Sequence, residues 1–257
     1  EVLQNSCNPG FMEIGFRLGK EKLFNYIHSY GFGEKSGIDL LGEAKGIVFK
    51  DSNIGPVELA TSSFGQGNSS TPIQLTNAMS ASINGGNLLT PYVLKKIVNE
   101  LGDVVLENTP VVKRRVISEN TSALMRHSLE SVSALGTGRN AYVDGYRVGG
   151  KTGTAQKVGP NGAYMQGNYI LSFLGAAPMN DPKAVVYLAI DNPKNTNLLY
   201  VRNAYSSDRN EYIAFPSEIS AIFKAEKLSA ALDLLDKLQI LASAHPAALD
   251  AIEQIKA

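Results

Sequence analysis

The fold of this 257-residue chain is decided by the stretch Gly149-Gly150-Lys151-Thr152-Gly153-Thr154-Ala155-Gln156-Lys157. We expect a strand here, because its glycines let another backbone approach closely. Lys151 supplies a fixed positive charge, and Thr152 and Thr154 supply hydroxyl donors. Together these groups predict a site that holds a carboxylate of an extended peptide, where a backbone N–H of the strand would help to stabilise an acyl oxyanion.

The same lysine also completes a phosphate-loop pattern. Residues 145–152 fit Gly-x-x-x-x-Gly-Lys-Thr, and the apolar run 185–190 ends at Asp191, as a magnesium-holding strand would. A phosphate loop needs a helix directly after it, because the helix N-terminus faces the phosphates. Residues 153–162 contain three glycines and a proline, which disfavour that helix. A P-loop nucleotide hydrolase is therefore the less favoured alternative, and a helix after Thr152 would be its signature.

A second motif, Ser6-Cys7-Asn8, precedes the first predicted helix, where short polar side chains bond to backbone groups and to one another. Taken alone, this motif is typical of a helix cap. Ser-x-Asn followed later by Lys-Thr-Gly is, however, the arrangement of the serine acyltransferases that recognise penicillin. The two motifs in this order favour acyl transfer over nucleotide hydrolysis.

Hydrophobic spacing and turn residues predict a mixed fold. Helices are expected at residues 8–18, 23–30, 71–83 and 118–132, a hairpin at 92–106, and strands at 149–157, 170–177 and 184–191. The short links between the last three strands predict an antiparallel sheet, and the fold class is α+β. Residues 31–70 are rich in Gly and Ser and are expected to be loop with short strands. We expect the carboxylates of that region, at Asp39, Glu43 and Glu58, to be solvated rather than catalytic.

Ten segments of the chain resemble the transpeptidase domain of class B penicillin-binding proteins of the sporulation type. They are residues 5–11, 20–24, 31–33, 36–40, 64–67, 71–74, 84–86, 136–140, 149–157 and 191–194. The resemblance covers about residues 1–196, and it implies an incomplete serine β-lactamase-like fold with a helical lobe and a remnant of the antiparallel sheet. The resemblance does not extend to residues 197–257, which are expected to form a divergent, mostly helical tail.

The resemblance implies peptidoglycan D,D-transpeptidation, in which a serine attacks a D-Ala-D-Ala stem peptide and passes the acyl group to an amine. β-Lactams would acylate the same serine. The implied site residues are catalytic Ser6, Asn8 and Lys151 and substrate-binding Thr152, Gly153 and Thr154. Ser6 would relay protons and Asn8 would orient the nucleophile's lysine. Lys151 and the two threonines would bind the terminal carboxylate, and the Thr154 N–H would form half of the oxyanion hole.

One part of the family pattern is missing from this sequence. No serine is followed three residues later by a lysine, so the nucleophile motif Ser-x-x-Lys is absent. The family places that motif well before Ser-x-Asn, and the simplest interpretation is that this chain is the later portion of the domain. We therefore expect no acyl transfer from this chain alone. The first alternative is a non-catalytic substrate-binding or interaction fragment of the same fold.

Composition excludes several other classes of function. Lys+Arg and Asp+Glu are 24 each, so a net charge of +0 gives no reason to expect nucleic acid as a partner. One cysteine and three scattered histidines give no zinc-site spacing, and no metal or cofactor is expected. No run of 18 apolar residues occurs, so no segment of this sequence is expected to span a bilayer. From the resemblance, the expected partners are the stem peptide and β-lactams, and the parent protein would work at the extracytoplasmic face of the bacterial membrane, anchored by a segment not in this sequence.

Overall fold

The computed structural model describes residues 1–160, 162–193, 204–206 and 211–213. The chain consists of two compact units, Glu1–Pro193 and Lys194–Ala257. In the second unit the described residues form two short antiparallel strands, β8 (Ala204–Ser206) and β9 (Glu211–Ile213). The rest of the predicted helical tail lies outside the described residues.

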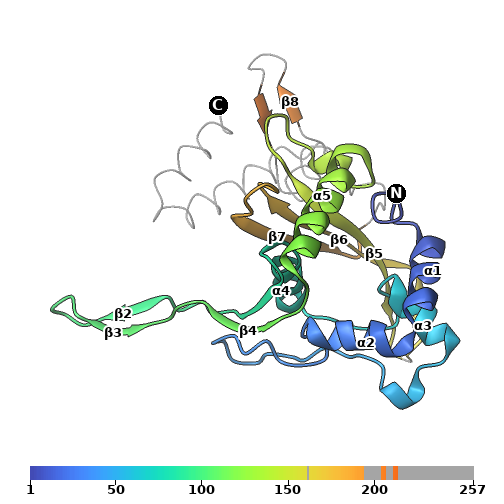
Figure 1. The fold of residues 1–257 in the computed structure, drawn as a ribbon, viewed down its shortest axis with the longest axis horizontal. Helices are drawn as coiled ribbons and strands as arrows, with labels where there is room; N and C mark the ends of the chain where they lie inside the picture. Colours follow the sequence, from blue (N-terminus) through green and yellow to red (C-terminus); the bar gives the residue numbers. More distant parts are fainter. Residues whose placement is uncertain (161, 194–203, 207–210, 214–257) are drawn as a thin grey trace. The chain divides into compact units, whose positions relative to one another are not determined.

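An antiparallel sheet of three strands forms the centre of the first unit (Figure 1). Its strands are β5 (Gly149–Val158), β6 (Tyr164–Ala177) and β7 (Ala184–Asp191), in the order β5-β6-β7. The links between them are short, as antiparallel neighbours allow. The three predicted strands and their antiparallel arrangement are thus confirmed.

The phosphate-loop interpretation of Lys151 is wrong. It required a helix after Thr152, but β5 continues as a strand to Val158. Lys151 pairs with Leu174 of β6, and Thr152 pairs with Phe173. A strand does not converge its amides on one point, so this segment lacks the helix N-terminus that binds phosphate groups in such loops.

Two helices cover the sheet and supply its core. They are α4 (Pro72–Ile83) and α5 (Glu119–Leu135), and Figure 1 shows both beside the strands. Each begins where a hydroxyl caps it: Thr71 accepts from the Gln74 N–H, and Ser118 accepts from the Thr121 N–H. The buried cluster between helices and sheet consists of Met79, Ile83, Leu129, Ala176 and Met179.

The remaining helices form a lobe around the start of the chain. They are α1 (Asn8–Leu18), α2 (Lys20–Ser29) and α3 (Pro56–Ser63), and α1 packs against α3. Gly19, at a φ of 81°, separates α1 from α2. This left-handed conformation is easily adopted only by glycine, so the sequence ends one helix and starts the next at this residue.

The expectation of loop with short strands over residues 31–70 is wrong in part. This region contains α3 and a short 3-10 helix, η1 (Asp51–Asn53), and its extended structure is limited to an isolated bridge between Ile47 and Ser69. Helix α3 starts with Pro56, which suits the first turn, and Glu58 accepts a hydrogen bond from the Gly55 N–H at 2.9 Å. Eight residues are too few to show a clear helical period.

Two hairpin ladders connect α4 to α5. Strand β1 (Asn87–Thr90) pairs with β4 (Val111–Arg115), and β2 (Lys96–Val98) pairs with β3 (Val104–Glu107). Figure 1 shows β2 and β3 as a ribbon that extends away from the helices. Every residue of β2 and β3 is exposed, although most are aliphatic. The hairpin predicted at residues 92–106 is confirmed.

The side chain of a buried glutamine on α4 connects the glycine-rich loops to this helix by hydrogen bonds. Gln74 is 2% exposed, and its Nε2 donates to the carbonyls of Gly31, Glu34 and Lys45 at 3.3, 2.7 and 2.9 Å. Its Oε1 accepts from the Thr71 N–H at 2.9 Å. One side chain thus satisfies backbone groups from three segments that have no ladder of their own.

We expect Gln74→Ala to lower the free energy of unfolding by about 2 to 4 kcal/mol, because it leaves several buried backbone groups without partners. Urea unfolding followed by circular dichroism measures this change. Gln166→Ala, the same substitution at an exposed position, is the matched control and should change stability by less than about 0.5 kcal/mol. Equal losses in the two variants would contradict the anchoring role of Gln74.

Candidate functional site

The structure brings the two sequence motifs into direct contact. The Lys151 Nζ donates to the Ser6 Oγ at 2.6 Å and to the Thr152 carbonyl at 2.8 Å. Lys151 stands on β5, whereas Ser6 lies just before α1. The sequence predicted these two side chains at one site, and the contact confirms their proximity.

Ser6 is held in a conformation that non-glycine residues seldom adopt. Its φ is 51°, in the left-handed region, which costs about 1 to 3 kcal/mol for a residue with a Cβ. Backbone bonds on either side hold it there: the Ser6 N–H donates to the Leu3 carbonyl, and the Cys7 N–H donates to the Val2 carbonyl. Strain of this kind is kept where the surrounding structure fixes a side chain for a task. Here it directs the Ser6 hydroxyl at Lys151.

A second line of contacts joins the start of the chain to β5. The Thr137 N–H donates to the Gln4 carbonyl at 3.1 Å, and the Thr137 and Thr152 hydroxyl oxygens lie 2.9 Å apart. Gly136 allows this approach, because a Cβ there would overlap the Gln4 carbonyl. The sequence marked the segment 136–140 as part of the family pattern but indicated no role for Thr137. The sequence offered one signal for Thr137: it lies between two glycines, next to the end of a predicted helix.

Asn8 and Thr154 line a cleft beside these contacts. The cleft has a volume of about 530 Å³. Its lining comes from Asn8, Ile47, residues 64–69, residues 154–156, Val158, Tyr164 and Tyr169. Strand β5 therefore forms one wall, and the glycine-rich 64–69 loop forms another.

Two of the three glycines of β5, Gly150 and Gly153, lie close against the neighbouring strand β6. A Cβ on Gly150 would lie 2.5 Å from the Phe173 ring, and a Cβ on Gly153 would lie 2.5 Å from the Ser172 Oγ. Gly150 thus lets the backbone of β6 approach closely, since a Cβ there would also lie 2.6 Å from the Leu174 carbonyl oxygen, whereas the neighbour at Gly153 is a side chain. A substrate contact through the backbone of Gly153 stays a prediction.

Burial sets the electrostatics of the site. Desolvation lowers the pKa of Lys151 below its ordinary value of 10.5, since a half-buried ammonium has lost part of its hydration. Within the described residues, this ammonium bonds to a hydroxyl and a carbonyl and forms no ion pair with a carboxylate. An anionic ligand would therefore meet a cation that is not already neutralised.

The loop carboxylates are not free acids or bases. Asp39 accepts from the N–H groups of Val93 and Leu94 at 2.7 and 2.8 Å, and these bonds lower its pKa. Glu43 accepts from the Ser36 hydroxyl, and Glu58 caps α3. They bind loop and helix backbone and lie outside the cleft lining. All three accept hydrogen bonds from backbone N–H groups, and their lack of a catalytic role stays a prediction.

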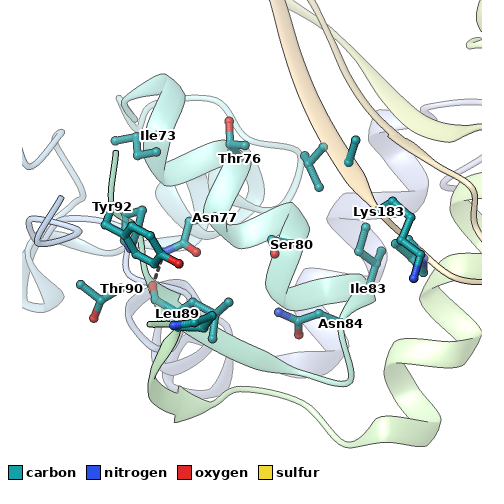
Figure 2. A pocket seen from close by; sticks show the side chains of 15 residues that line it. Ile73, Thr76, Asn77, Ser80, Ile83, Asn84, Leu89, Thr90, Tyr92 and Lys183 are labelled. Atoms are coloured by element: carbon teal, nitrogen blue, oxygen red, sulfur yellow. Dashed lines mark hydrogen bonds between the residues drawn. The ribbon is translucent and has the colours of Figure 1, made fainter. Parts of the chain in front are cut away.

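A separate cavity lies between α4, β1 and the start of β7, with a volume of about 410 Å³ (Figure 2). Ile73, Asn77, Leu89, Tyr92 and Lys183 are among its lining residues, and the Asn77 amide donates to the Leu89 carbonyl at 2.8 Å. None of the predicted site residues lines it. It is not part of the Ser6–Lys151 site.

Metal-ligating side chains do not gather anywhere in the described ranges. No group of three or more His, Cys, Asp or Glu side chains there could hold a metal ion. No helix in the same ranges combines the length and apolar character needed to cross a bilayer.

Known proteins share both the sequence and the fold. Stage V sporulation protein D of Bacillus subtilis (strain 168) is 59% identical over 197 residues, which cover 76% of this chain and 30% of that protein. The peptidoglycan D,D-transpeptidase FtsI homolog of Mesostigma viride is 34% identical over 212 residues, covering 75% of this chain and 35% of that protein. The chain thus spans about a third of the length of these relatives.

Two solved structures superpose well on the chain. Penicillin-binding protein 3 from Mycobacterium tuberculosis, complexed with aztreonam, has a TM-score of 0.71 and 32% identity and covers 76% of this chain and 45% of that one. The transpeptidase domain of penicillin-binding protein 3 from Burkholderia pseudomallei has a TM-score of 0.67 and 31% identity and covers 88% and 64%.

The lowered pKa of Lys151 predicts a pH-dependent difference in stability between the natural chain and Lys151→Met. Between the lowered pKa and 10.5 the unfolded chain binds the lysine proton more tightly, so unfolding takes up a proton. The stability of the natural chain relative to the variant should therefore rise with pH across that window. Urea unfolding of both proteins from pH 8 to 10.5 measures this. Tyr30, whose pKa burial raises, is common to both and cancels in the difference. A difference that is flat or falls with pH would contradict the prediction.

The family model for the penicillin binding protein transpeptidase domain matches residues 1–213. That range contains Ser6, Asn8 and the whole of β5, and the relatives agree with it in sequence and in fold. The chain belongs to the penicillin-binding protein transpeptidase family and represents part of a class B transpeptidase domain.

Proposed function

We propose that this chain supplies the carboxylate-binding and proton-relay groups of a peptidoglycan D,D-transpeptidase site that also binds β-lactams. The contact between the Lys151 Nζ and the Ser6 Oγ carries this proposal. Family membership and the names of the relatives support the reaction class. The substrate would be a stem peptide that ends in D-Ala-D-Ala.

The substrate carboxylate would bind along the exposed edge of β5. In the described sheet β5 pairs with β6 on one side only, which leaves main-chain groups on its other side for an extended peptide. The Lys151 ammonium and the hydroxyls of Thr152 and Thr154 would bind the terminal carboxylate. Charge-assisted hydrogen bonds of this kind are about twice as strong as neutral ones. The Thr154 N–H would provide half of the oxyanion hole.

Ser6 is arranged for proton relay. A hydroxyl has one proton to donate and two lone pairs to accept with. Because Lys151 donates to the Ser6 Oγ, the hydroxyl proton of Ser6 is left for another acceptor. That acceptor would be the leaving amine of the scissile amide. Asn8, in the cleft lining, would orient the substrate amide and the lysine of the nucleophile motif.

The nucleophile itself would come from outside this chain, which contains no Ser-x-x-Lys. The whole protein would be anchored in the membrane and act at its extracytoplasmic face. Residues 1–196 would be the later part of the transpeptidase domain, and 197–257 a mostly helical tail. The unit boundary after Pro193 supports this division, whereas the family match up to residue 213 favours a longer domain. For the chain alone, binding of the substrate without catalysis is the second candidate function. The absence of Ser-x-x-Lys from the sequence favours it.

The chain alone should form no covalent adduct with penicillin, because removing the nucleophile removes the covalent step. Intact-mass spectrometry after incubation with benzylpenicillin tests this. A complete class B transpeptidase domain, labelled in parallel, shows that the reagent is active. A stoichiometric mass increase on the natural chain, abolished by Ser6→Ala, would contradict the assignment of Ser6 as a relay.

The chain should bind N-acetylated peptides that end in D-Ala-D-Ala and lose affinity when the end carboxylate is amidated. A charge-assisted hydrogen bond is worth about 1.5 to 3 kcal/mol, so Lys151→Ala should weaken binding by about tenfold or more. Chemical-shift titration by NMR measures the affinity. Lys157→Ala, which removes a lysine of the same strand that lies outside Lys-Thr-Gly and pairs with Asp191, is the control and should have little effect. Equal affinities for acid and amide would contradict the carboxylate site.

A further inference from the structure

A second cavity adjoins the cleft and takes no part in the proposed reaction. It has a volume of about 530 Å³ and is lined by His28, Gly33 and residues 45–51. Ile47 lines both this cavity and the cleft along β5. Ile47, which is 70% exposed, is therefore the residue at which the two hollows adjoin.

Residues 46–49 separate the two cavities, and we call this segment the partition. Backbone hydrogen bonds hold it in place. The Ile47 N–H donates to the Ser69 carbonyl at 2.7 Å, and the Ser69 N–H donates to the Ile47 carbonyl at 2.8 Å. The Phe49 N–H donates to the Asn68 Oδ1 at 3.3 Å. Gly46, at a φ of 70°, lies so close to Ser69 that a Cβ would overlap the Ser69 carbonyl. The 46–49 segment is thus hydrogen-bonded to the 64–69 loop that lines the cleft.

Positive charge exceeds negative charge around this second cavity. Lys45 and Lys50 line it, and Asp51 is its one acidic lining residue. Asp51 lies 3.9 Å from the His28 Nε2, a distance at which the pair is weak. Neither Lys45 nor Lys50 forms an ion pair within the part of the chain that the structure describes. Two lysines outside any described ion pair and one aspartate therefore line a cavity beside the candidate substrate cleft.

We infer that this cavity, held open by the Gly46–Phe49 partition, binds a carboxylate of the substrate peptide that precedes its D-Ala-D-Ala end. The inference rests on the proposed function, because it requires the peptide to lie in the β5 cleft. The terminal carboxylate meets Lys151, and the peptide continues past Ile47 to Lys45 and Lys50. The chain would thereby select acidic stem peptides over neutral ones of equal length.

Exposed charge pairs are weak, so two lysines together should favour an acidic peptide by about two- to thirtyfold. The probes are N-acetylated peptides that end in D-Ala-D-Ala and carry either Glu or Gln one, two or three residues before it. NMR titration gives the affinity of each peptide. For the preferred Glu peptide, the amides of His28 and Lys50 should shift, and the preference should decline with added salt.

The double variant K45Q/K50Q should lose the preference for Glu and keep its affinity for the Gln peptide. The matched control K22Q/K96Q also removes two exposed lysines, but neither lines the cleft or the second cavity, and it should keep the preference.

The outcomes separate the two claims. If the Gln peptides bind but no Glu position improves affinity, or if K45Q/K50Q keeps the preference, the carboxylate site is wrong and the proposed function stands. If none of the peptides binds the natural chain, the proposed function fails and this inference fails with it.

Discussion

The hydrogen bond from the Lys151 ammonium to the Ser6 hydroxyl is the interaction on which the site depends. Three features accompany it: strand β5 carries the lysine, Ser6 has a positive φ, and Gly136 lets the start of the chain approach the segment after α5. Partial burial then makes the ammonium a stronger partner for an anion, since less water competes for it. The helices and the sheet hold the Lys151 strand and the Ser6 turn in these relative positions.

Much of this arrangement could be read from local sequence. The strand at Lys151, the caps at Thr71 and Ser118 and the hairpin near Asn99 each have a short-range physical signal that the structure follows. The phosphate-loop match failed for the same reason that the strand prediction succeeded: the residues after Thr152 suit an extended chain. The residues after Thr152 therefore distinguish the phosphate-loop motif from the Lys-Thr-Gly motif, although both motifs contain Lys151 and Thr152.

Other parts lie beyond local sequence. Helix α3 is too short to show a period, and its cap is a glycine whose partner is Glu58. The Thr137–Thr152 contact joins two segments that no spacing rule connects. The groups that exclude a Cβ at Gly150 are the Phe173 ring and the Leu174 carbonyl of the neighbouring strand, which only the strand pairing reveals. In each case the deciding partner is remote in sequence.

The site residues Ser6 and Lys151 are separated by 145 positions along the chain. Closing so long a loop has an entropic cost that grows with the logarithm of its length, and it is repaid only when the intervening helices and strands have formed. Contacts of high sequence separation also slow folding relative to local ones. The ammonium and the hydroxyl are therefore expected to meet late in folding, and a partly folded chain would retain its helices while lacking the geometry for ligand recognition.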